Sequence, residues 1–386
     1  MDESPISQTP PPLISQPPVI APPPPAKPRR GRGWVVATVI LAVLLFIAGM
    51  IIFGQFAIHS VGLSGGFKAA NAREVGPKLE ECLIEDNDSA DKIAVITVDG
   101  VIGEHDADND GNSLVDIVKA QLDRAADDKH VKAVLLKMDS PGGEVLASDE
   151  IYNAVRDFQE DEADDHGKPG RKGKPVICSM GSLAASGGYY ISSGCRWIVA
   201  NELTITGSIG VIMHGYNYRG LMDKVGVSPM TYKSGKFKDM LSGERATNEI
   251  PPEERAMVQG LIDETYQKFK DVVADGRANA HDLNKKSGKP LADNWEDFAD
   301  GRVVSGTQAL NLGLVDELGD FDAAVDRAMT ITHLKTANLV EYRERYDLSN
   351  LLSMFGQSGK APDIKLNLGF EGPKLRAGLM YFLYQP

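Results

Sequence analysis

Cysteine is scarce in this chain of 386 residues, which has only Cys82, Cys178 and Cys195. Three cysteines allow at most one disulfide, so a small scaffold held together by several bridges is excluded. Cys178 and Cys195 stand among apolar neighbours, where a thiol packs as a small hydrophobic group. We therefore expect packing cysteines, and their number does not decide the redox compartment.

Basic residues are also in deficit, because 41 lysines and arginines face 54 aspartates and glutamates, for a net charge of −13. No basic patch of the kind that binds a phosphate backbone stands out, so we expect no nucleic-acid partner. The chain is long enough for one large domain or two and can bury a sizeable core.

Charge is absent altogether from residues 34–53, WVVATVILAVLLFIAGMIIF. At about 1.5 Å per residue, a helix of this length spans roughly 30 Å, the hydrocarbon thickness of a bilayer. Four basic residues precede the run within 27–32, and the next charge is Lys68. The positive-inside rule then predicts a cytoplasmic N-terminus and an extracytoplasmic remainder. A cleavable signal peptide is the competing interpretation, but its apolar core is normally about 7–15 residues, so we favour a permanent anchor over residues 34–54.

The segments on either side of this anchor are poor in signs of regular structure. Residues 1–33 are rich in proline and serine. Such a composition cannot form a core, so we expect an extended or disordered cytoplasmic tail. Residues 55–90 are predicted to be a stalk that leads to a globular domain.

Apolar, β-branched runs alternate with helix-period segments through the globular part. The predicted strands are 93–98, 131–136, 175–178 and 197–200, and the predicted helices are 114–122, 144–158 and a helix that begins near Ser186. This alternation is typical of an α/β fold with a largely parallel sheet. Ligands in such folds bind at the carboxyl ends of the strands, where two loops carry Ser140–Gly143 and Ser186.

Ser186 lies in a run of very small residues, SLAASGGYY over 182–190, at a strand-to-helix passage. A serine there has a hydroxyl clear of large neighbours, and helix-start amides beside it favour negative charge, which suits a nucleophile. The alternative is a small-residue helix that packs closely on a sheet. The turn 139–144, DSPGGE, could supply oxyanion donors, and Gly143 and Gly187 are our candidates for the two amides. An ordinary tight turn is the alternative there.

The base that would activate Ser186 is left open by the residues themselves. His214, after an apolar run, is the histidine nearest to an interesting segment. A lysine in an apolar pocket can also act as a neutral base, and Lys233, Lys236 and Lys238 are candidates. Exposure to solvent is the usual state of any one lysine, so chemistry alone does not rank these three.

Four motifs in this order resemble the bacterial signal peptide peptidase A (SppA) family: DSPGGEV from 139, SLAASGGYYIS from 182, TGSIGV from 206 and KSGKFKDMLS from 233. The set is far more specific than any single motif. The resemblance covers about residues 91–335 and leaves 336–386 as a C-terminal extension. It implies a ClpP/crotonase-like fold and a serine peptidase domain with a Ser/Lys dyad.

Site roles follow from this resemblance, position by position. Ser186 matches the nucleophile, Lys238 the general base, and Ser208 the serine whose hydroxyl positions that lysine. Gly143 matches the oxyanion donor, and Lys233 and Lys236 become non-catalytic. The turn begins with Asp139, where an asparagine is common in the family, and residues 159–174 are a charged insertion that we interpret as an exposed loop.

The resemblance also implies a function and its setting. The expected activity is endoproteolysis of remnant signal peptides and similar apolar segments through an acyl-enzyme, without a cofactor. Because each motif occurs once, the chain resembles the short form of the family. We therefore expect a homo-oligomer in the cell (inner) membrane, whose dyad can be completed between subunits.

Two other classes of function stay open beside the peptidase. A crotonase-type acyl-CoA enzyme would share the fold and the oxyanion glycines, although an exported domain argues against a cytoplasmic cofactor. A catalytically silent membrane scaffold would keep the fold without the chemistry.

Two further segments have specific interpretations. Residues 106–111, DADNDG, begin like a calcium loop, but the twelfth position is Ile117 where an acid is required, so we predict no metal site. The apolar residues 378–384 could pack on a neighbour or on the membrane. We also hypothesise that they lie near an active site as a substrate-like segment.

Overall fold

The computed structural model describes residues 41, 76–104, 112–161, 172–344 and 380–384. The chain divides into two compact units, Met1–Glu74 and Val75–Pro386, and only Leu41 of the first is described. The predicted tail 1–33, the anchor 34–54 apart from Leu41, and the calcium-like segment 106–111 therefore lie outside the described residues. Within the described part of the chain, no helix has the length and apolar character needed to cross a bilayer.

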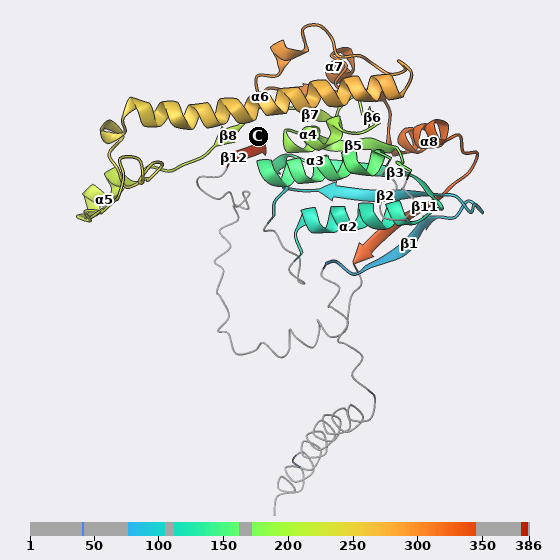
Figure 1. Cartoon of the computed structure of the whole chain (residues 1–386), viewed down its shortest axis with the longest axis horizontal. Helices are drawn as coiled ribbons and strands as arrows, with labels where there is room; N and C mark the ends of the chain where they lie inside the picture. Colours follow the sequence, from blue (N-terminus) through green and yellow to red (C-terminus); the bar gives the residue numbers. More distant parts are fainter. Residues whose placement is uncertain (1–40, 42–75, 105–111, 162–171, 345–379, 385–386) are drawn as a thin grey trace, which may run out of the picture. The chain divides into compact units, whose positions relative to one another are not determined.

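A largely parallel sheet forms the centre of the second unit, with the strand order β1-β11-β2-β3-β5-β6-β10 (Figure 1). Neighbours from β11 to β10 run parallel, whereas β1 is antiparallel to β11. Their bounds are β1 (Leu79–Glu85), β2 (Lys92–Asp99), β3 (Val131–Ser140), β5 (Val176–Ala185), β6 (Trp197–Ala200), β10 (Glu317–Leu318) and β11 (Asn338–Glu344). The predicted α/β fold with a largely parallel sheet is confirmed.

Two smaller groups of strands lie where the candidate site forms: one extends the main sheet, and the other is a separate sheet. β7 (Ile205–Gly207) pairs with the end of β5 and with β9 (Val303–Ser305). A separate three-stranded sheet has the order β4-β12-β8, with β4 (Gly142–Glu144), β8 (Ile212–Met213) and β12 (Met380–Leu383). Every strand of this second sheet is therefore short and lies next to the loops that leave the main sheet.

Helices cover both faces of the main sheet because its strands are apolar on both sides. One buried cluster contains Ala94, Ile96 and Val98 of β2 together with residues of α2, α3, α4 and α6. The other contains Ile93 and Val95 together with residues of α8. The helix bounds are α2 (Leu114–Asp127), α3 (Val145–Gln159), α4 (Gly187–Ser193), α5 (Arg219–Val225), α6 (Pro252–Leu283), α7 (Gly306–Asn311) and α8 (Phe321–Thr332), with 3-10 turns η1 (Thr247–Glu249) and η2 (Trp295–Phe298).

The sheet reaches beyond the predicted domain bounds of 91–335 on both sides. β1 comes from the segment predicted as stalk, and β11 from the predicted C-terminal extension. β1 is half-buried only at Leu79 and Cys82 and exposed at its other positions, so LEECLIE has the weak apolar signal of an edge strand. Most of the charged insertion, residues 162–171, lies outside the described residues.

A buried ion pair joins α6 to the segment that precedes β10. The Arg277 guanidinium lies 2.5 Å from Asp316, and both side chains are almost fully buried. Asp316 also accepts a hydrogen bond from the Ile198 amide of β6, and Tyr189 of α4 donates to the Leu314 carbonyl nearby. This pair therefore links α6 to β6, close to Tyr189 of α4.

We expect Arg277→Met to lower the free energy of unfolding by about 3–5 kcal/mol, because Asp316 would stay buried without its partner. Urea unfolding of the purified protein measures this loss. Lys119→Met is the matched control, since the Lys119–Glu150 pair is exposed and contributes at most about 1 kcal/mol. Equal losses in the two variants would contradict the assignment.

Candidate active site

Ser186 stands between β5 and α4 with a backbone that few residues other than glycine adopt. Its φ is 54° and its ψ is −114°, and the residue is 1% exposed. Its amide donates to the Gly207 carbonyl of β7 at 2.8 Å, and its carbonyl accepts from the Tyr190 amide at 2.8 Å. The β5–β7 pairing and the first turn of α4 thus hold a strained serine whose hydroxyl makes no hydrogen bond to a described residue.

The turn from Ser140 to Glu144 is clamped against residues 100–102. The Ser140 hydroxyl donates to the Gly100 carbonyl at 2.6 Å and accepts from the Gly142 amide at 3.0 Å. Ile102 exchanges backbone hydrogen bonds with Gly142 and Glu144. A Cβ at Gly143 would lie 1.8 Å from the Ile102 carbonyl oxygen, so only glycine fits there.

The two predicted oxyanion amides converge beside Ser186. A Cβ built on Gly187 would lie 3.1 Å from the Gly143 amide nitrogen. A Cβ built on Gly142 would lie 2.5 Å from the Gly187 amide nitrogen. Two loops far apart in the sequence therefore bring the backbone of Gly143 close to that of Gly187, which directly follows the buried Ser186. Two N–H groups in such a place can stabilise a tetrahedral oxyanion.

Ser208 is the residue after Gly207, whose carbonyl accepts the hydrogen bond from the Ser186 amide. Ser208 has a φ of 50° and donates its amide to the Arg302 carbonyl at 2.8 Å. Ser208 lines a cavity of about 660 Å³ that also includes His214, the histidine alternative, together with Leu383 and Tyr384. The structure thus places Ser208 near the site without a direct bond to Ser186.

Lys238 is not brought alongside Ser186 within this chain. It lies in the loop between α5 and α6, which Figure 1 shows at the outer end of α6, apart from α4. Its side chain is exposed, and its ammonium makes no hydrogen bond or ion pair with a described residue. Sequence reasoning alone could not locate this loop, because nothing in the motif specifies how it packs.

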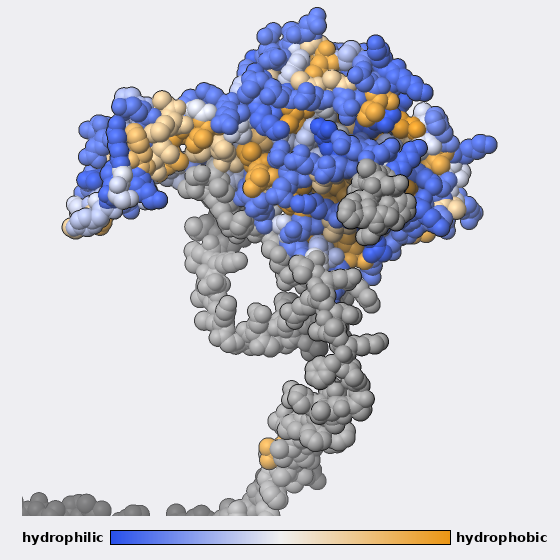
Figure 2. Space-filling view, in the orientation of Figure 1, coloured by the Kyte–Doolittle hydropathy of each residue, from blue (hydrophilic) through white to orange (hydrophobic). Residues whose placement is uncertain are grey.

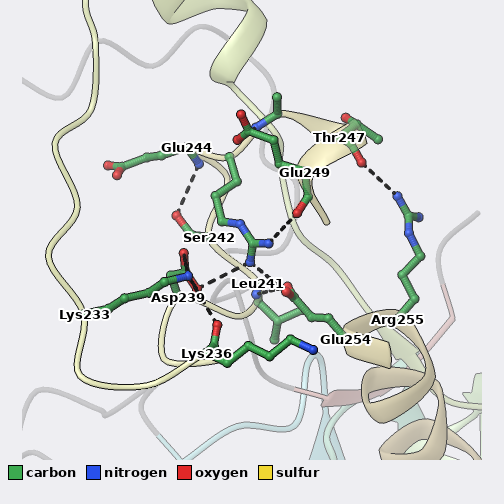
Figure 3. A network of polar contacts seen from close by, with 12 residues as sticks. Lys233, Lys236, Asp239, Leu241, Ser242, Glu244, Thr247, Glu249, Glu254 and Arg255 are labelled. Atoms are coloured by element: carbon green, nitrogen blue, oxygen red, sulfur yellow. Dashed lines mark hydrogen bonds and ion pairs between the residues drawn. The ribbon is translucent and has the colours of Figure 1, made fainter. Parts of the chain in front are cut away.

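The other two lysines of this loop each pair with an acid, and Figure 3 shows Lys233 beside Asp239. Lys233 lies 2.8 Å from Asp239, and Lys236 lies 3.5 Å from Glu253. The Lys233 hydrogen bond lowers the pKa of Asp239, and the Arg245 charge adds to this effect. Arg245 also pairs with Glu254 of α6, so the network fixes the loop to the start of that helix and leaves Lys238 outside it.

A pocket of aromatic side chains beside α4 was not predicted from the sequence. Tyr190 packs edge-on against Tyr152 and against Phe269 of α6, at centroid distances of 5.3 and 5.0 Å. The Tyr190 hydroxyl donates to Asp149 at 2.6 Å, and burial together with this carboxylate raises the pKa of Tyr190. The adjacent tyrosines after Gly187-Gly188 were the only local signal, and it indicated no more than a buried helix.

Comparison with known proteins gives several matches to this chain. A family model described as Peptidase family S49 matches residues 169–335. "Putative protease slr0021" of Synechocystis is 43% identical over 211 residues, which are 55% of this chain and 67% of that protein. "Putative signal peptide peptidase SppA" of Enterococcus faecium is 36% identical over 274 residues, 69% of this chain and 71% of that protein. "Protease 4" of Haemophilus influenzae is 35% identical over 252 residues, but these are only 36% of its length.

We expect Ser186→Gly to be more stable than Ser186→Ala by about 1 kcal/mol, because glycine relieves the positive φ and alanine does not. Both variants lack the hydroxyl, so the comparison isolates the backbone. Urea unfolding midpoints of the two proteins measure the difference. A glycine variant that is the less stable of the two would contradict the strained geometry.

Proposed function

The chain belongs to peptidase family S49, a family of proteases, and from this premise we propose that it is a membrane-anchored serine endopeptidase with a Ser186/Lys238 dyad. The observation that carries the proposal is the close approach of Gly143 to Gly187, the residue that directly follows the buried Ser186. This is the geometry that acyl transfer requires, because donors must lie where negative charge develops.

The proposed reaction passes through an acyl-enzyme. Neutral Lys238, oriented by the Ser208 hydroxyl, takes the proton of Ser186 as its oxygen attacks a peptide carbonyl. The Gly143 and Gly187 amides stabilise the oxyanion, and the leaving amine receives the proton. Water activated by Lys238 then hydrolyses the ester. No cofactor takes part in any step.

We further propose that Lys238 reaches the Ser186 of a neighbouring copy. Two observations support this arrangement: Lys238 lies apart from Ser186 in its own chain, and its loop belongs to a segment with many exposed apolar residues. Figure 2 shows pale and orange residues along this projecting segment. Its exposed apolar side chains are Tyr216, Tyr218, Leu221, Val225, Val227, Met230 and Tyr232. A contact between copies would bury this surface, which a monomer rarely leaves open.

The proposed substrates are remnant signal peptides and similar apolar segments. The uncharged run 34–53 supports a bilayer anchor, with a cytoplasmic N-terminus and an extracytoplasmic catalytic unit in the cell (inner) membrane. Such an anchor would hold the active site near the membrane surface. The name of the Enterococcus faecium relative agrees with this substrate class.

We expect Ser186→Ala and Lys238→Ala each to lower hydrolysis of a fluorogenic apolar peptide by at least about 10³-fold, because nucleophile and base act as a unit. Lys236→Ala is the matched control and should keep wild-type activity, since its partner Glu253 lies on the surface. If Lys236→Ala lost activity and Lys238→Ala kept it, the general base would be Lys236 and not Lys238.

Mixing the two inactive variants tests the shared site. If dyads form between neighbours, a one-to-one mixed assembly should regain about a quarter of wild-type activity, because random assembly pairs an intact Ser186 with an intact Lys238 at that frequency. The measurement is peptide hydrolysis after subunit exchange, at matched oligomeric state. A mixture that stays inactive after verified exchange would place both residues in one chain's site.

A further inference from the structure

Four charged side chains form one connected row in the loop that carries Lys238. Lys233 donates to both carboxylate oxygens of Asp239, each at 2.8 Å, as Figure 3 shows. The Arg245 guanidinium lies 3.5 Å from the same carboxylate and 2.6 Å from Glu254 at the start of α6. Positive and negative groups therefore alternate along the row, and their formal charges cancel.

The same network fixes the backbone next to Lys238. The Leu241 amide donates to the Glu254 carboxylate at 3.2 Å, and Leu241 has a φ of 66°. Glu254 is only 3% exposed, so a buried acid holds a left-handed residue three positions after Lys238. The Lys238 amide itself donates to the Gly235 carbonyl at 3.3 Å. The loop therefore carries Lys238 on a backbone that is tied to α6.

Asp239 is the acid that bears most directly on Lys238. It is the next residue in the chain, so the two Cα atoms are about 3.8 Å apart. A nearby negative charge favours the protonated form of a lysine. The hydrogen bond from Lys233, with the added charge of Arg245, lowers the pKa of Asp239, so this acid stays ionised but compensated. Without those two partners, Asp239 would oppose the neutral Lys238 that the proposed mechanism requires.

The other charged groups around the row are more exposed or lie further along the chain. Lys236 and Glu253 pair at 3.5 Å with side chains that are 62% and 64% exposed, so solvent screens their charges. The remaining charged side chains of the loop and of the start of α6 are Glu244, Glu249 and Arg255. In the proposed shared site, the neighbouring copy's cavity that Ser208 lines would add His214, Asp263 and Asp300.

We propose that Lys233 and Arg245 are positioning residues of the peptidase, which hold the Asp239 carboxylate and cancel its charge so that Lys238 can act as a neutral base. This inference rests on the proposed Ser186/Lys238 function and adds two residues outside the dyad. Both act through Asp239, and neither touches the substrate or the reacting atoms.

The first test is the pH dependence of kcat/KM for a fluorogenic apolar peptide. Lys233→Met should move the acidic limb upward by about half a pH unit, because an uncompensated Asp239 favours protonated Lys238. Asp239→Asn should move the limb downward by a similar amount, because Lys233 is then left without its acid. Limbs that coincide with the wild-type limb in both variants would refute the inference.

A double variant separates the effect of charge from damage to the loop. Lys233→Met combined with Asp239→Asn should return the limb to the wild-type position, because the charges cancel again, whereas two structural defects would add. Lys233→Arg is the matched control and should keep the wild-type profile, because it preserves the charge. A double variant that is displaced further than either single variant would assign these residues a purely structural role.

Salt provides a second criterion for the same variants. At about 1 M salt the Debye length falls to about 3 Å, so the displacements caused by Lys233→Met and Asp239→Asn should shrink to less than half. Displacements that keep their full size in high salt would contradict a role through charge.

A labelling experiment follows Lys238 without any activity. In Ser186→Ala, at the oligomeric state of the wild type, the rate at which trace acetic anhydride acetylates Lys238 is measured against pH by peptide mass spectrometry, since only the neutral amine reacts. Adding Lys233→Met should move this curve upward by about half a pH unit. Lys119 of α2, which pairs with Glu150, is the internal reference and should not move. An unmoved Lys238 curve would overturn the inference.

Failure of this inference and failure of the proposed function give different results. If Lys238→Ala is inactive while Lys233→Met leaves the pH profile and the labelling curve unchanged, the function stands and the positioning role is refuted. If Lys238→Ala keeps the wild-type rate, Lys238 is not the base, and the positioning role is refuted together with the dyad.

Discussion

The left-handed backbone at Ser186 is the constraint on which the rest of the site depends. A non-glycine residue at φ 54° and ψ −114° persists only where surrounding contacts impose it. Here the β5–β7 pairing fixes the residue from one side, and the first turn of α4 fixes it from the other. That conformation points the next amide, of Gly187, toward the turn that carries Gly143. The proposed oxyanion site therefore depends on how β5 ends.

The first turn of α4, which follows Ser186, is held in place by the packing of that helix. α4 lies between the main sheet and α6, and Tyr189 and Tyr190 are both fully or almost fully buried there. The buried Arg277–Asp316 pair joins α6 to the segment that precedes β10, and through the Ile198 amide to β6, so the helix that packs on α4 is fixed to the sheet. α6 then continues past the core and carries the loop of Lys238. One helix thus supports the proposed nucleophile and holds the proposed base away from it, which is why we propose that this base acts in a neighbouring copy.

The short strands β4 and β8 explain why this site accepts an extended chain. Both present backbone donors and acceptors across a gap, and an unpaired strand edge readily recruits another strand. β12 satisfies both edges, while Phe382 fills the aromatic pocket. A peptide substrate would need the same backbone pairing. Recognition by main-chain bonds, with one buried apolar side chain, would suit the proposed action on apolar segments of varied sequence.

Local signals in the sequence determined the elements of this protein. Apolar, β-branched runs located the strands near Ile93, Val131 and Val176, and a helix-period segment located the helix that became α3, because the residues of each element reflect how it is buried. The small residues around Ser186 and the glycines of the 139–144 turn likewise identified the candidate nucleophile and amides, since only small residues leave a hydroxyl and N–H groups accessible. The tertiary structure alone decided which of these meet. Gly143 reaches Gly187 through parallel pairing of β3 and β5, and the edge strand β1 joins the sheet through β11 although its own sequence has a weak apolar signal. The position of Lys238 depends on the length of α6, and the register of β12 depends on two free edges elsewhere in the chain. A strand of four residues has too little sequence to specify its partners, so its place at the active site is a property of the fold.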